Sequence, residues 1–502
     1  MKRPARTTIG VAVTIALSAG IGRLHSQQNP SREEVARLTF ENGRGHMRRG
    51  NYEEGLKDFR TVAETYPDSA LADNARLEVS RYLLDIAHDA GAAVREADEI
   101  LKRYPVSDSA PYAYLVQGEV LLQRSRRKDD LEKAVATFDR VPGIYRDAEA
   151  VPRALYLSAE AVRLSQQPAR ALAKYRAIEA TYPSDPVIAK VHVGAGAALA
   201  ATGDVAAAME EFQFARAEDV PKEDADAALA RLSTLYRLYV RPATVSPFVS
   251  TAKDVLAPRV KDVVSMVITP AGSGYFVSRQ AVTPFESGKG EPAPGAVKPR
   301  AVTLDELGRI IVIDAGTVKR RNGPSTPLAV PGASKALEET SAAVALKNGD
   351  WLVASDDEGG EKGIQRFGPM PTLKHVGPFA PQRAARLAVN EFDEVAVLDR
   401  DQKTVKIFDD AGKQITAIAP KGTGYELRNP VDIAFDALGN LYVLDRTALL
   451  VFSARRPLTL LKTFTEPETS PSALRRATAF ALDPFGRLYI ADDHAEKIRI
   501  YQ

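Results

Sequence analysis

The stretch NPVDIAFDALGNLYVLD, residues 429–445, holds two apolar runs on either side of a short turn. The runs 431–435 and 441–444 have the length and the valine, isoleucine and aromatic content of β-strands. Gly439 lies shortly before the second run, where a tight turn favours glycine. The pattern predicts a pair of strands, the second of which ends at Asp445.

Apolar strands that end in aspartate or serine recur through the second half of the chain. The endings are Val277-Ser278, Ile313-Asp314, Ala354-Ser355, Leu398-Asp399, Leu444-Asp445 and Ala491-Asp492. Successive endings are 36, 41, 44, 46 and 47 residues apart, which suits four short strands per unit. Tight-turn glycines precede several of these strands, at Gly308, Gly349, Gly439 and Gly486. Six units of this size predict a six-bladed β-propeller.

Residues 429–445 resemble the NHL repeat, and the last unit repeats the pattern from Asp483 to Tyr501. The resemblance implies an NHL-like propeller. The chain ends after the third strand of this last unit, which would leave an open strand edge, a known liability. We expect the segment around 245–255 to supply the missing outer strand and close the ring.

The first half of the chain is punctuated by prolines at regular intervals. Pro67, Pro105, Pro142, Pro183 and Pro221 are 38, 37, 41 and 38 residues apart. Each is expected to close a helix, because proline cannot continue one. The stretches between them are rich in helix-forming residues and leave room for two helices each. The spacing predicts an α-solenoid of helical hairpins.

The hairpins resemble tetratricopeptide repeats (TPR). The resemblance is carried by residues 50–59 followed by Tyr66-Pro67, by Gly43, and by Gly203-Asp204 with Phe212. It implies about five units over residues 33–220, a capping helix over 224–239, and a concave groove, lined by the first helices, that binds a protein or peptide partner. The units are also similar to repeat proteins of the Gram-negative envelope, including those of outer-membrane assembly and of the Tol-Pal system.

The third unit carries an insertion from Arg124 to Asp130. We interpret its basic residues, Arg124, Arg126, Arg127 and Lys128, as a flexible loop.

The composition excludes several classes of protein. The 502 residues contain no cysteine, so disulfides, a thiol nucleophile, cysteine-type zinc sites and a lipid-anchored cysteine are excluded. The 67 basic and 65 acidic side chains nearly balance, which argues against nucleic acid as a partner.

The first 26 residues have the layout of a secretory signal peptide. Basic residues at the start are followed by an uncharged apolar run, 9–21, and then by a polar exit. The run is shorter than the ~20 residues that span a bilayer, although an uncleaved membrane anchor is the alternative. The predicted domains are therefore 1–26 signal peptide or anchor, 27–240 TPR-like and 241–502 propeller. The predicted location is the periplasm or cell envelope.

No motif for nucleotide binding or hydrolysis occurs, and the six histidines are scattered. We expect no catalytic residue, no cofactor and no metal ligand. Asp314, Asp399, Asp445 and Asp492 are the main candidates for a central cation, because such rings suit calcium or magnesium. The alternative, which we favour, is that each aspartate caps its own turn. The acidic run 356–358 is interpreted as a solvated loop.

Three arginines of the first helix are candidate partner-binding residues. Arg37, Arg44 and Arg48 fall at i, i+7 and i+11, on one side of the helix. If this side faces the groove, the guanidinium groups would pair with carboxylates of an acidic peptide. The alternative is a solvated charged face.

These observations favour a non-enzymatic, exported scaffold or adaptor, with the TPR groove and the propeller as two binding faces. One alternative is a propeller enzyme, similar to lactonases or lyases that use a central divalent metal. Another is a sensor whose propeller binds a glycan or peptide. The propeller half contains only two histidines, His375 and His494, which disfavours the enzyme.

Overall fold

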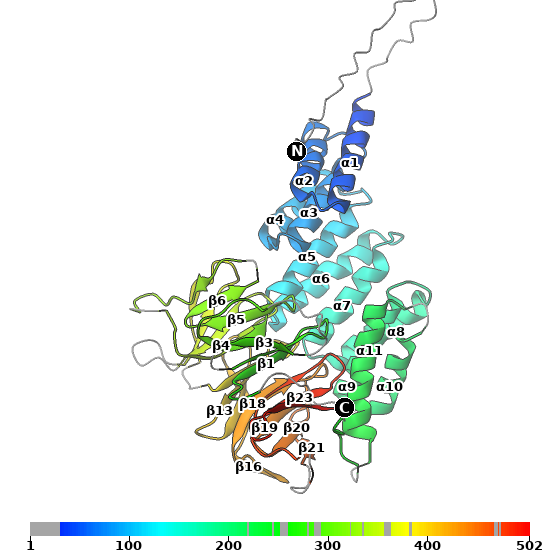
Figure 1. The fold of residues 1–502 in the computed structure, drawn as a ribbon. Coiled ribbons are helices and arrows are strands. Elements are labelled where there is room, and N and C mark those ends of the chain that lie inside the picture. Colours follow the sequence, from blue (N-terminus) through cyan, green and yellow to red (C-terminus); the bar gives the residue numbers. More distant parts are fainter. Residues whose placement is uncertain are drawn as a thin grey trace, which may run out of the picture. The chain divides into compact units, whose positions relative to one another are not determined.

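A computed structural model shows a helical half followed by a half made of strands (Figure 1). It describes residues 31–217, 220–242, 245–251, 260–278, 281–285, 293–321, 323–333, 336–355, 363–380, 384–465, 470 and 473–502. The predicted signal peptide and the acidic run 356–358 lie outside the described residues. By their internal contacts, the residues form two compact units that divide between Val79 and Ser80.

The helical half consists of five antiparallel hairpins and a last helix. The hairpins are α1 (Arg32–Arg48) with α2 (Tyr52–Thr65), α3 (Ala72–Asp85) with α4 (Ala90–Arg103), α5 (Ala110–Arg124) with α6 (Lys128–Ile144), α7 (Val151–Leu164) with α8 (Pro168–Thr181), and α9 (Ile188–Thr202) with α10 (Val205–Phe214). The last helix, α11 (Lys222–Leu235), continues into a π-helical turn, η1 (Tyr236–Val240). The predicted solenoid of five units with a capping helix is confirmed.

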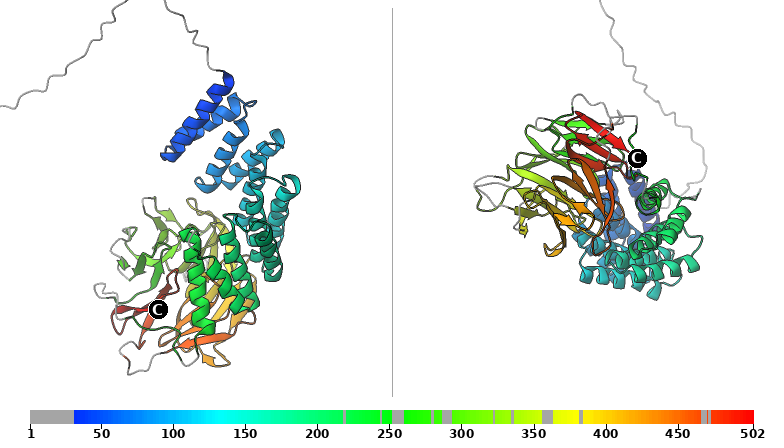
Figure 2. Two further views of the ribbon diagram at one scale, coloured as in Figure 1. Left: turned by 90° about the vertical axis from the view of Figure 1, so that its right-hand side faces the viewer. Right: turned by 90° about the horizontal axis from the view of Figure 1, so that it is seen from below.

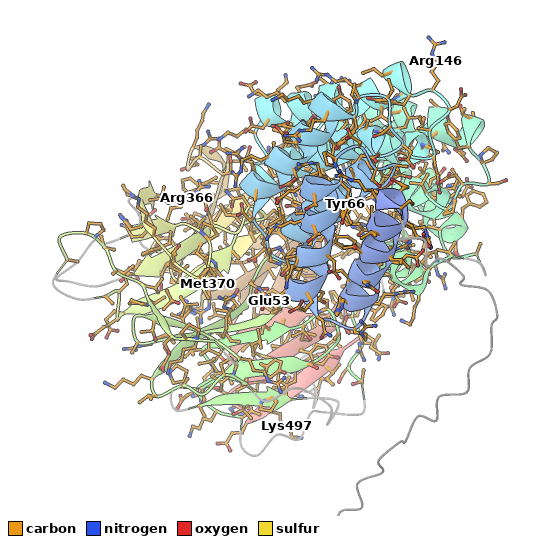
Figure 3. The ribbon with its side chains drawn as sticks, turned by 90° about the horizontal axis from the view of Figure 1, so that it is seen from above. Glu53, Tyr66, Arg146, Arg366, Met370 and Lys497 are labelled. Atoms are coloured by element: carbon orange, nitrogen blue, oxygen red, sulfur yellow. The ribbon has the colours of Figure 1, made fainter. Side chains whose placement is uncertain are left out.

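Tyrosines end the second helices of the first four hairpins. Tyr66, Tyr104, Tyr145 and Tyr182 are the C-caps of α2, α4, α6 and α8, and each backbone N–H donates to the carbonyl four residues earlier. Glu53 and Tyr66 mark the two ends of α2 in Figure 3. Two of the five prolines do not close a helix as predicted. Pro142 lies inside α6, which continues to Ile144, and Pro221 is the N-cap of α11, well after α10 has ended at Phe214. The repeat is therefore set by the tyrosines, and Tyr145 is the member that lacks a following proline.

Glycines let the two helices of a hairpin approach closely. A Cβ on Gly43 would lie 2.9 Å from the ring of Phe59, and a Cβ on Gly118 would lie 2.3 Å from the ring of Phe138. Gly196 of α9 meets the ring of Phe212 of α10 in the same way, at 2.7 Å. The aromatic rings of the second helices thus fill space that only glycine leaves open on the first helices.

The strands form six blades, as predicted. The first blade has β1 (Ser265–Ile268), β2 (Gly274–Val277) and β3 (Val282–Phe285), and the second has β4 (Pro299–Leu304), β5 (Ile310–Asp314), β6 (Thr317–Arg320) and β7 (Thr326–Pro327). The third has β8 (Thr340–Ala345), β9 (Trp351–Ser355), β10 (Gly363–Phe367) and β11 (His375–Ala380), and the fourth has β12 (Arg386–Val389), β13 (Val395–Asp399), β14 (Thr404–Phe408) and β15 (Gln414–Ile418). A small ribbon, β16 (Lys421–Gly422) with β17 (Tyr425–Glu426), precedes the fifth blade, β18 (Pro430–Phe435), β19 (Leu441–Asp445), β20 (Ala448–Phe452) and β21 (Leu460–Phe464). The sixth has β22 (Ala477–Leu482), β23 (Leu488–Asp492) and β24 (Lys497–Tyr501).

The first strand of each blade faces the axis of the propeller. Parts of β1, β4, β8, β12, β18 and β22 surround a central cavity of about 250 Å³. The six predicted strand endings all belong to the second strands or directly follow them, and these strands are almost completely buried between neighbouring blades. Gly439 adopts φ +78° in the turn before β19, as the sequence predicts.

The ring is closed by the segment that precedes the first blade, also as predicted. Val249 donates its N–H to the carbonyl of Gln502 at 2.8 Å, and Gln502 donates back at 2.9 Å. Thr251 donates to the carbonyl of Ile500 at 2.9 Å, and Ser250 pairs with Tyr501 in antiparallel register. These bonds cover the outer edge of β24 and join the two ends of the propeller sequence.

Removal of one closing hydrogen bond should destabilise the propeller. Thr251→Pro deletes the N–H that bonds to Ile500 and leaves that carbonyl without its partner, which costs about 1–3 kcal/mol. Thr251→Ala keeps the N–H and is the matched control. Urea unfolding of both variants checks the prediction, and equal stabilities would show that the closing strand contributes nothing.

Candidate functional site

The three candidate arginines all lie on α1 with exposed side chains. Arg37 forms an ion pair with Glu41 on the same helix, at 3.1 Å, while Arg44 and Arg48 are exposed near its C-terminal end. The structure places them on one helix, as the spacing indicates, and does not test their binding role.

The blade-end aspartates accept hydrogen bonds from nearby backbone N–H groups. Asp314 accepts from Val297 at 3.0 Å and Asp445 accepts from Asn429 at 2.9 Å. Asp399 accepts from Gln402 at 2.9 Å, and Asp492 accepts from His494 at 3.0 Å. Asp399 and Asp492 therefore cap the turns that follow them, as the favoured interpretation predicts, whereas Asp314 and Asp445 bond to backbone 17 and 16 residues earlier. Within the described part of the chain, no cluster of three or more acidic or histidine side chains is arranged to hold a metal ion.

The first helices of successive hairpins pack against one another: α5 contacts α7, α7 contacts α9, and α9 contacts α11. This arrangement puts the first helices on the inner side of the helical array, as in other helical solenoids. The helices α5–α11 follow one side of the propeller (Figure 2). The propeller reaches them through the turns that connect the first and second strands of the fourth, fifth and sixth blades.

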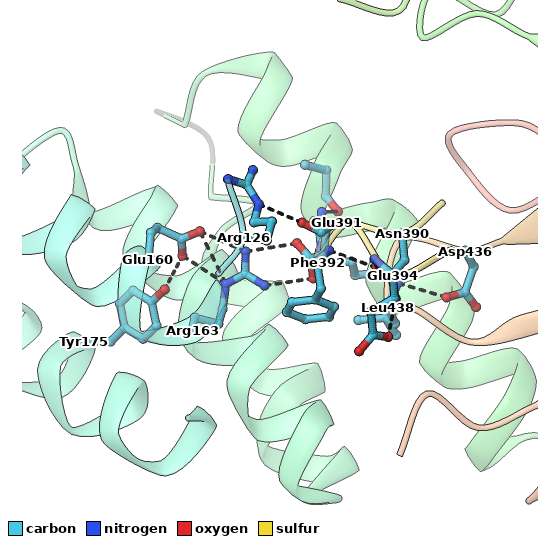
Figure 4. A network of polar contacts seen from close by, with 12 residues as sticks. Arg126, Glu160, Arg163, Tyr175, Asn390, Glu391, Phe392, Glu394, Asp436 and Leu438 are labelled. Atoms are coloured by element: carbon cyan, nitrogen blue, oxygen red, sulfur yellow. Dashed lines mark hydrogen bonds and ion pairs between the residues drawn. The ribbon is translucent and has the colours of Figure 1, made fainter. Parts of the chain in front are cut away.

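We call the contact between these turns and the helices α5–η1 the junction. The turn between the first and second strands of the fourth blade carries its central ion pair (Figure 4). Arg163, near the end of α7, donates to both carboxylate oxygens of Glu391, at 2.8 and 3.0 Å. Glu160 bonds the same guanidinium at 2.9 Å and accepts from the hydroxyl of Tyr175. Arg126 donates to the backbone carbonyl of Glu391 at 3.1 Å. One guanidinium thus joins a carboxylate of the helical array to a carboxylate of the propeller.

Burial and pairing act in opposite directions on these groups. Burial alone would lower the pKa of Arg163, but Glu160 and Glu391 hold that pKa well above its usual value. Burial alone would raise the pKa of Glu391, but Arg163 holds it below the usual range. Both groups therefore stay charged at neutral pH, because each supplies the counter-charge that the other lacks in a buried site.

Arg126 corrects the interpretation of the insertion. The expected flexible loop is only three residues long, since α5 ends at Arg124 and α6 begins at Lys128. Arg126 contacts the turn of the fourth blade, and Arg127 lies 3.5 Å from Asp410 of the same blade. The basic residues of the turn are thus part of the junction.

The neighbouring turns add polar contacts around this ion pair. Glu394 accepts from Gln166 at 2.7 Å and also bonds Arg456. Arg237 of η1 donates to the carbonyl of Gly486, in the sixth blade, at 2.8 Å. Tyr239 donates to Asn440, in the fifth blade, at 3.1 Å. Three consecutive blades are therefore fixed to the helices.

A cavity of about 370 Å³ remains between the two parts of this junction. Small side chains of α9, Ala197, Ala200 and Ala201, form one wall, and Phe392 and Leu438 contribute apolar surface from the propeller. Its charged groups, such as Arg163 and Glu394, already have partners in the chain. The cavity therefore offers apolar surface and few free polar groups.

One feature of the sequence could have indicated the junction. The turns before β5, β9, β19 and β23 have glycine where the fourth blade has Asp393, which adopts φ +56°. The same turn, residues 390–394, holds three acidic residues. An acidic replacement of a turn glycine in a single blade marks that turn as different from the others.

Two comparisons of sequence concern the helical half. The family model YfiO, described as "Outer membrane lipoprotein", matches residues 32–148. The outer membrane protein assembly factor BamD of Caulobacter vibrioides is 25% identical over 153 residues. That match covers 30% of this chain and 45% of BamD, so the chain spans less than half of that relative's length.

Three solved structures are each similar to part of the chain. A virginiamycin B lyase from Staphylococcus aureus has 11% identity and a TM-score of 0.30, over 49% of this chain and 82% of its own. A gluconolactonase from Xanthomonas campestris has 14% identity and a TM-score of 0.33, over 52% and 98%. The MamA protein has 15% identity and a TM-score of 0.29, over 36% and 90%. A search of the described helices for one of sufficient length and apolarity to cross a bilayer finds none. The chain is thus a TPR-type helical array, similar to YfiO and BamD over part of its length, followed by a six-bladed β-propeller.

Loss of the central ion pair should weaken the junction. Glu391→Gln removes the charge that compensates Arg163, and the loss of charge-assisted hydrogen bonds costs about 2 kcal/mol. Glu41→Gln breaks the exposed pair with Arg37 and should cost less than about 0.5 kcal/mol. The free energy of unfolding in urea measures both.

A double-mutant cycle with Arg163→Met separates the pair from other effects. We expect a coupling energy of about 1.5 kcal/mol or more between positions 163 and 391. Additive effects of the two substitutions would contradict a direct interaction.

Proposed function

We propose that this protein is an exported, non-enzymatic scaffold or adaptor of the cell envelope. The first hairpins bind a protein or peptide partner, and the propeller offers a second binding face. The proposal rests on the match of residues 32–148 to a family of outer membrane lipoproteins and on the similarity to BamD, an assembly factor. The location that follows is the periplasmic side of the envelope, with membrane attachment only if the N-terminal segment is retained.

One structural observation carries the proposal. The turns of the fourth to sixth blades contact α7, η1 and the α5–α6 turn, so that the propeller itself covers this part of the helical array. The region matched by the family model extends from α1 to α6 and therefore lies mostly before this junction. Partner binding is assigned to these first hairpins, and the later ones hold the propeller.

The chemistry of α1 indicates the kind of partner. Arg44 and Arg48 are exposed on one helix, where guanidinium groups can pair with carboxylates. We therefore propose an acidic segment of a protein as the ligand of this helix. Nucleic acid is not proposed, because basic and acidic side chains nearly balance over the whole chain.

Charge reversal on α1 should remove the partner. We expect full-length Arg44→Glu/Arg48→Glu protein to recover at least tenfold less partner from envelope extract than the wild type, because two attractive contacts become repulsive. The matched control is Lys57→Glu/Arg60→Glu, which makes the same charge change at exposed positions of α2. Quantitative mass spectrometry of the captured proteins gives the measurement. Equal recovery by both double variants rejects α1 as the binding surface.

The alternative of a metal-dependent propeller enzyme requires ligands near the axis. The four blade-end aspartates bond to backbone N–H groups, which supports a structural role for each. We expect elemental analysis of the purified full-length protein to find no divalent metal at one equivalent per chain. The enzyme would be favoured if the wild type held one tightly bound ion per chain and the Asp445→Asn variant did not hold it.

A further inference from the structure

A second cavity, of about 610 Å³, opens at the end of the propeller axis where the first strands begin. The turns between second and third strands and the segments before the first strands form its wall. Its cationic lining residues are Arg386, Arg400, Lys403, Arg428, Arg446 and Arg476, and its acidic ones are Asp262 and Asp493. Three consecutive blades, the fourth to sixth, supply all six cations.

This cavity lies at the end of the axis opposite to the helical junction. The first strands run from the cavity toward the turns that contact the helices, so strand length separates the two ends. All of its lining residues come from position 262 or later, and Arg386 also lines the central cavity between the six first strands. The basic cavity is therefore a mouth of the propeller channel.

The cations of this mouth outnumber the available counter-charges. Arg386 lies 3.4 Å from Asp432, and Arg476 lies 3.7 Å from Asp493. Arg428 pairs with Glu426 at 3.2 Å. In the described part of the chain, by contrast, no carboxylate oxygen lies within 4.0 Å of a side-chain nitrogen of Arg400 or Arg446. The guanidinium of Arg400 donates to a neutral group, the carbonyl of Val431, at 2.6 Å.

Burial and the neighbouring positive charges both act on Arg400. Burial, and then the like charges of Arg386 and Arg446, lower the pKa of Arg400 to about 10, although Asp432 acts in the opposite direction. The side chains of Arg400 and Arg446 nevertheless remain accessible to solvent within the cavity. Positive charges that repel one another around an accessible cavity are stabilised when an anion binds among them.

We propose that the channel mouth binds a small multivalent anion that carries two or more phosphate or carboxylate groups. Arg400 and Arg446, whose guanidinium groups have no carboxylate partner among the described residues, bind it, and Arg386 contributes positive charge from the floor of the mouth. Guanidinium groups bind both phosphate and carboxylate in a bidentate manner, so the two anionic groups share one recognition chemistry. The cavity volume is in the range of pockets for small ligands rather than for a folded protein.

Multivalency follows from the distribution of the cations. Arg400 comes directly after β13 of the fourth blade, and Arg446 comes directly after β19 of the fifth. They therefore approach the cavity from different blades. A ligand with two anionic groups can engage both, whereas a monovalent ion neutralises one and leaves the other.

Pyrophosphate and citrate test the proposal as probes of the two anionic groups. Isothermal titration calorimetry measures binding of each probe to the full-length protein. Thermal unfolding is measured with each probe and with sodium chloride at the same ionic strength. We expect pyrophosphate, citrate or both to bind and to raise the melting temperature above the sodium chloride reference. The stronger probe identifies phosphate or carboxylate as the preferred group.

Arg400→Gln/Arg446→Gln should weaken this binding at least ~10-fold, because two charge-assisted contacts are lost. The same variant without ligand should be as stable as the wild type or more so, since it removes repelling charges. Arg446→Gln alone is the second variant, at an exposed position. Lys413→Gln/Lys421→Gln removes two positive charges from exposed sites outside the cavity and should bind like the wild type. The proposal is overturned if neither probe binds, or if both double variants lose the same amount of binding.

Discussion

A buried guanidinium needs a counter-charge, and Arg163 obtains its counter-charges from two different parts of the chain. Glu160 comes from the same helix, and Glu391 comes from a propeller turn 228 residues further along the sequence. One carboxylate can accept hydrogen bonds from only some of the N–H groups of the guanidinium. The planar group of Arg163 therefore donates to both Glu160 and Glu391 (Figure 4). The contact of the fourth blade with α7 depends on this arrangement, and hydrogen bonds from η1 hold the fifth and sixth blades as well.

This junction divides the molecule into surfaces with different tasks. The turns of the fourth to sixth blades at one end of the propeller contact the helices. The later hairpins therefore hold the propeller of the same chain. The other end of the propeller axis opens into a cavity lined by six cations. The family match, which stops at residue 148, concerns hairpins that lie mostly before the junction. An envelope scaffold with a small-anion site on its propeller is consistent with this division.

Much of the architecture could be predicted because repeats encode local structure many times over. Six apolar strand endings indicated six blades, and the open last unit indicated closure by the segment around residue 250. Where a repeat signal was replaced, prediction failed. Pro142 lies inside α6 because Tyr145, and not the proline, ends that helix. The sequence predicts a flexible loop for the basic insertion because it does not show the partners of these residues. Glu391 and Asp410 are more than 260 residues away along the chain.

The sequence by itself determined the two repeat types and their number, because each depends on neighbours within one repeat. Only the tertiary structure decided which charged residues share a site. The acidic turn that holds Glu391 is unusual in sequence, but nothing there indicates Arg163 as its partner. Nor does the sequence indicate that Arg400 and Arg446, which follow blade-end aspartates in two separate blades, share a cavity. Charges interact through space over a few ångströms, whereas a repeat pattern reports distance along the chain. The junction and the basic channel mouth therefore became visible only after the blades and helices were brought together.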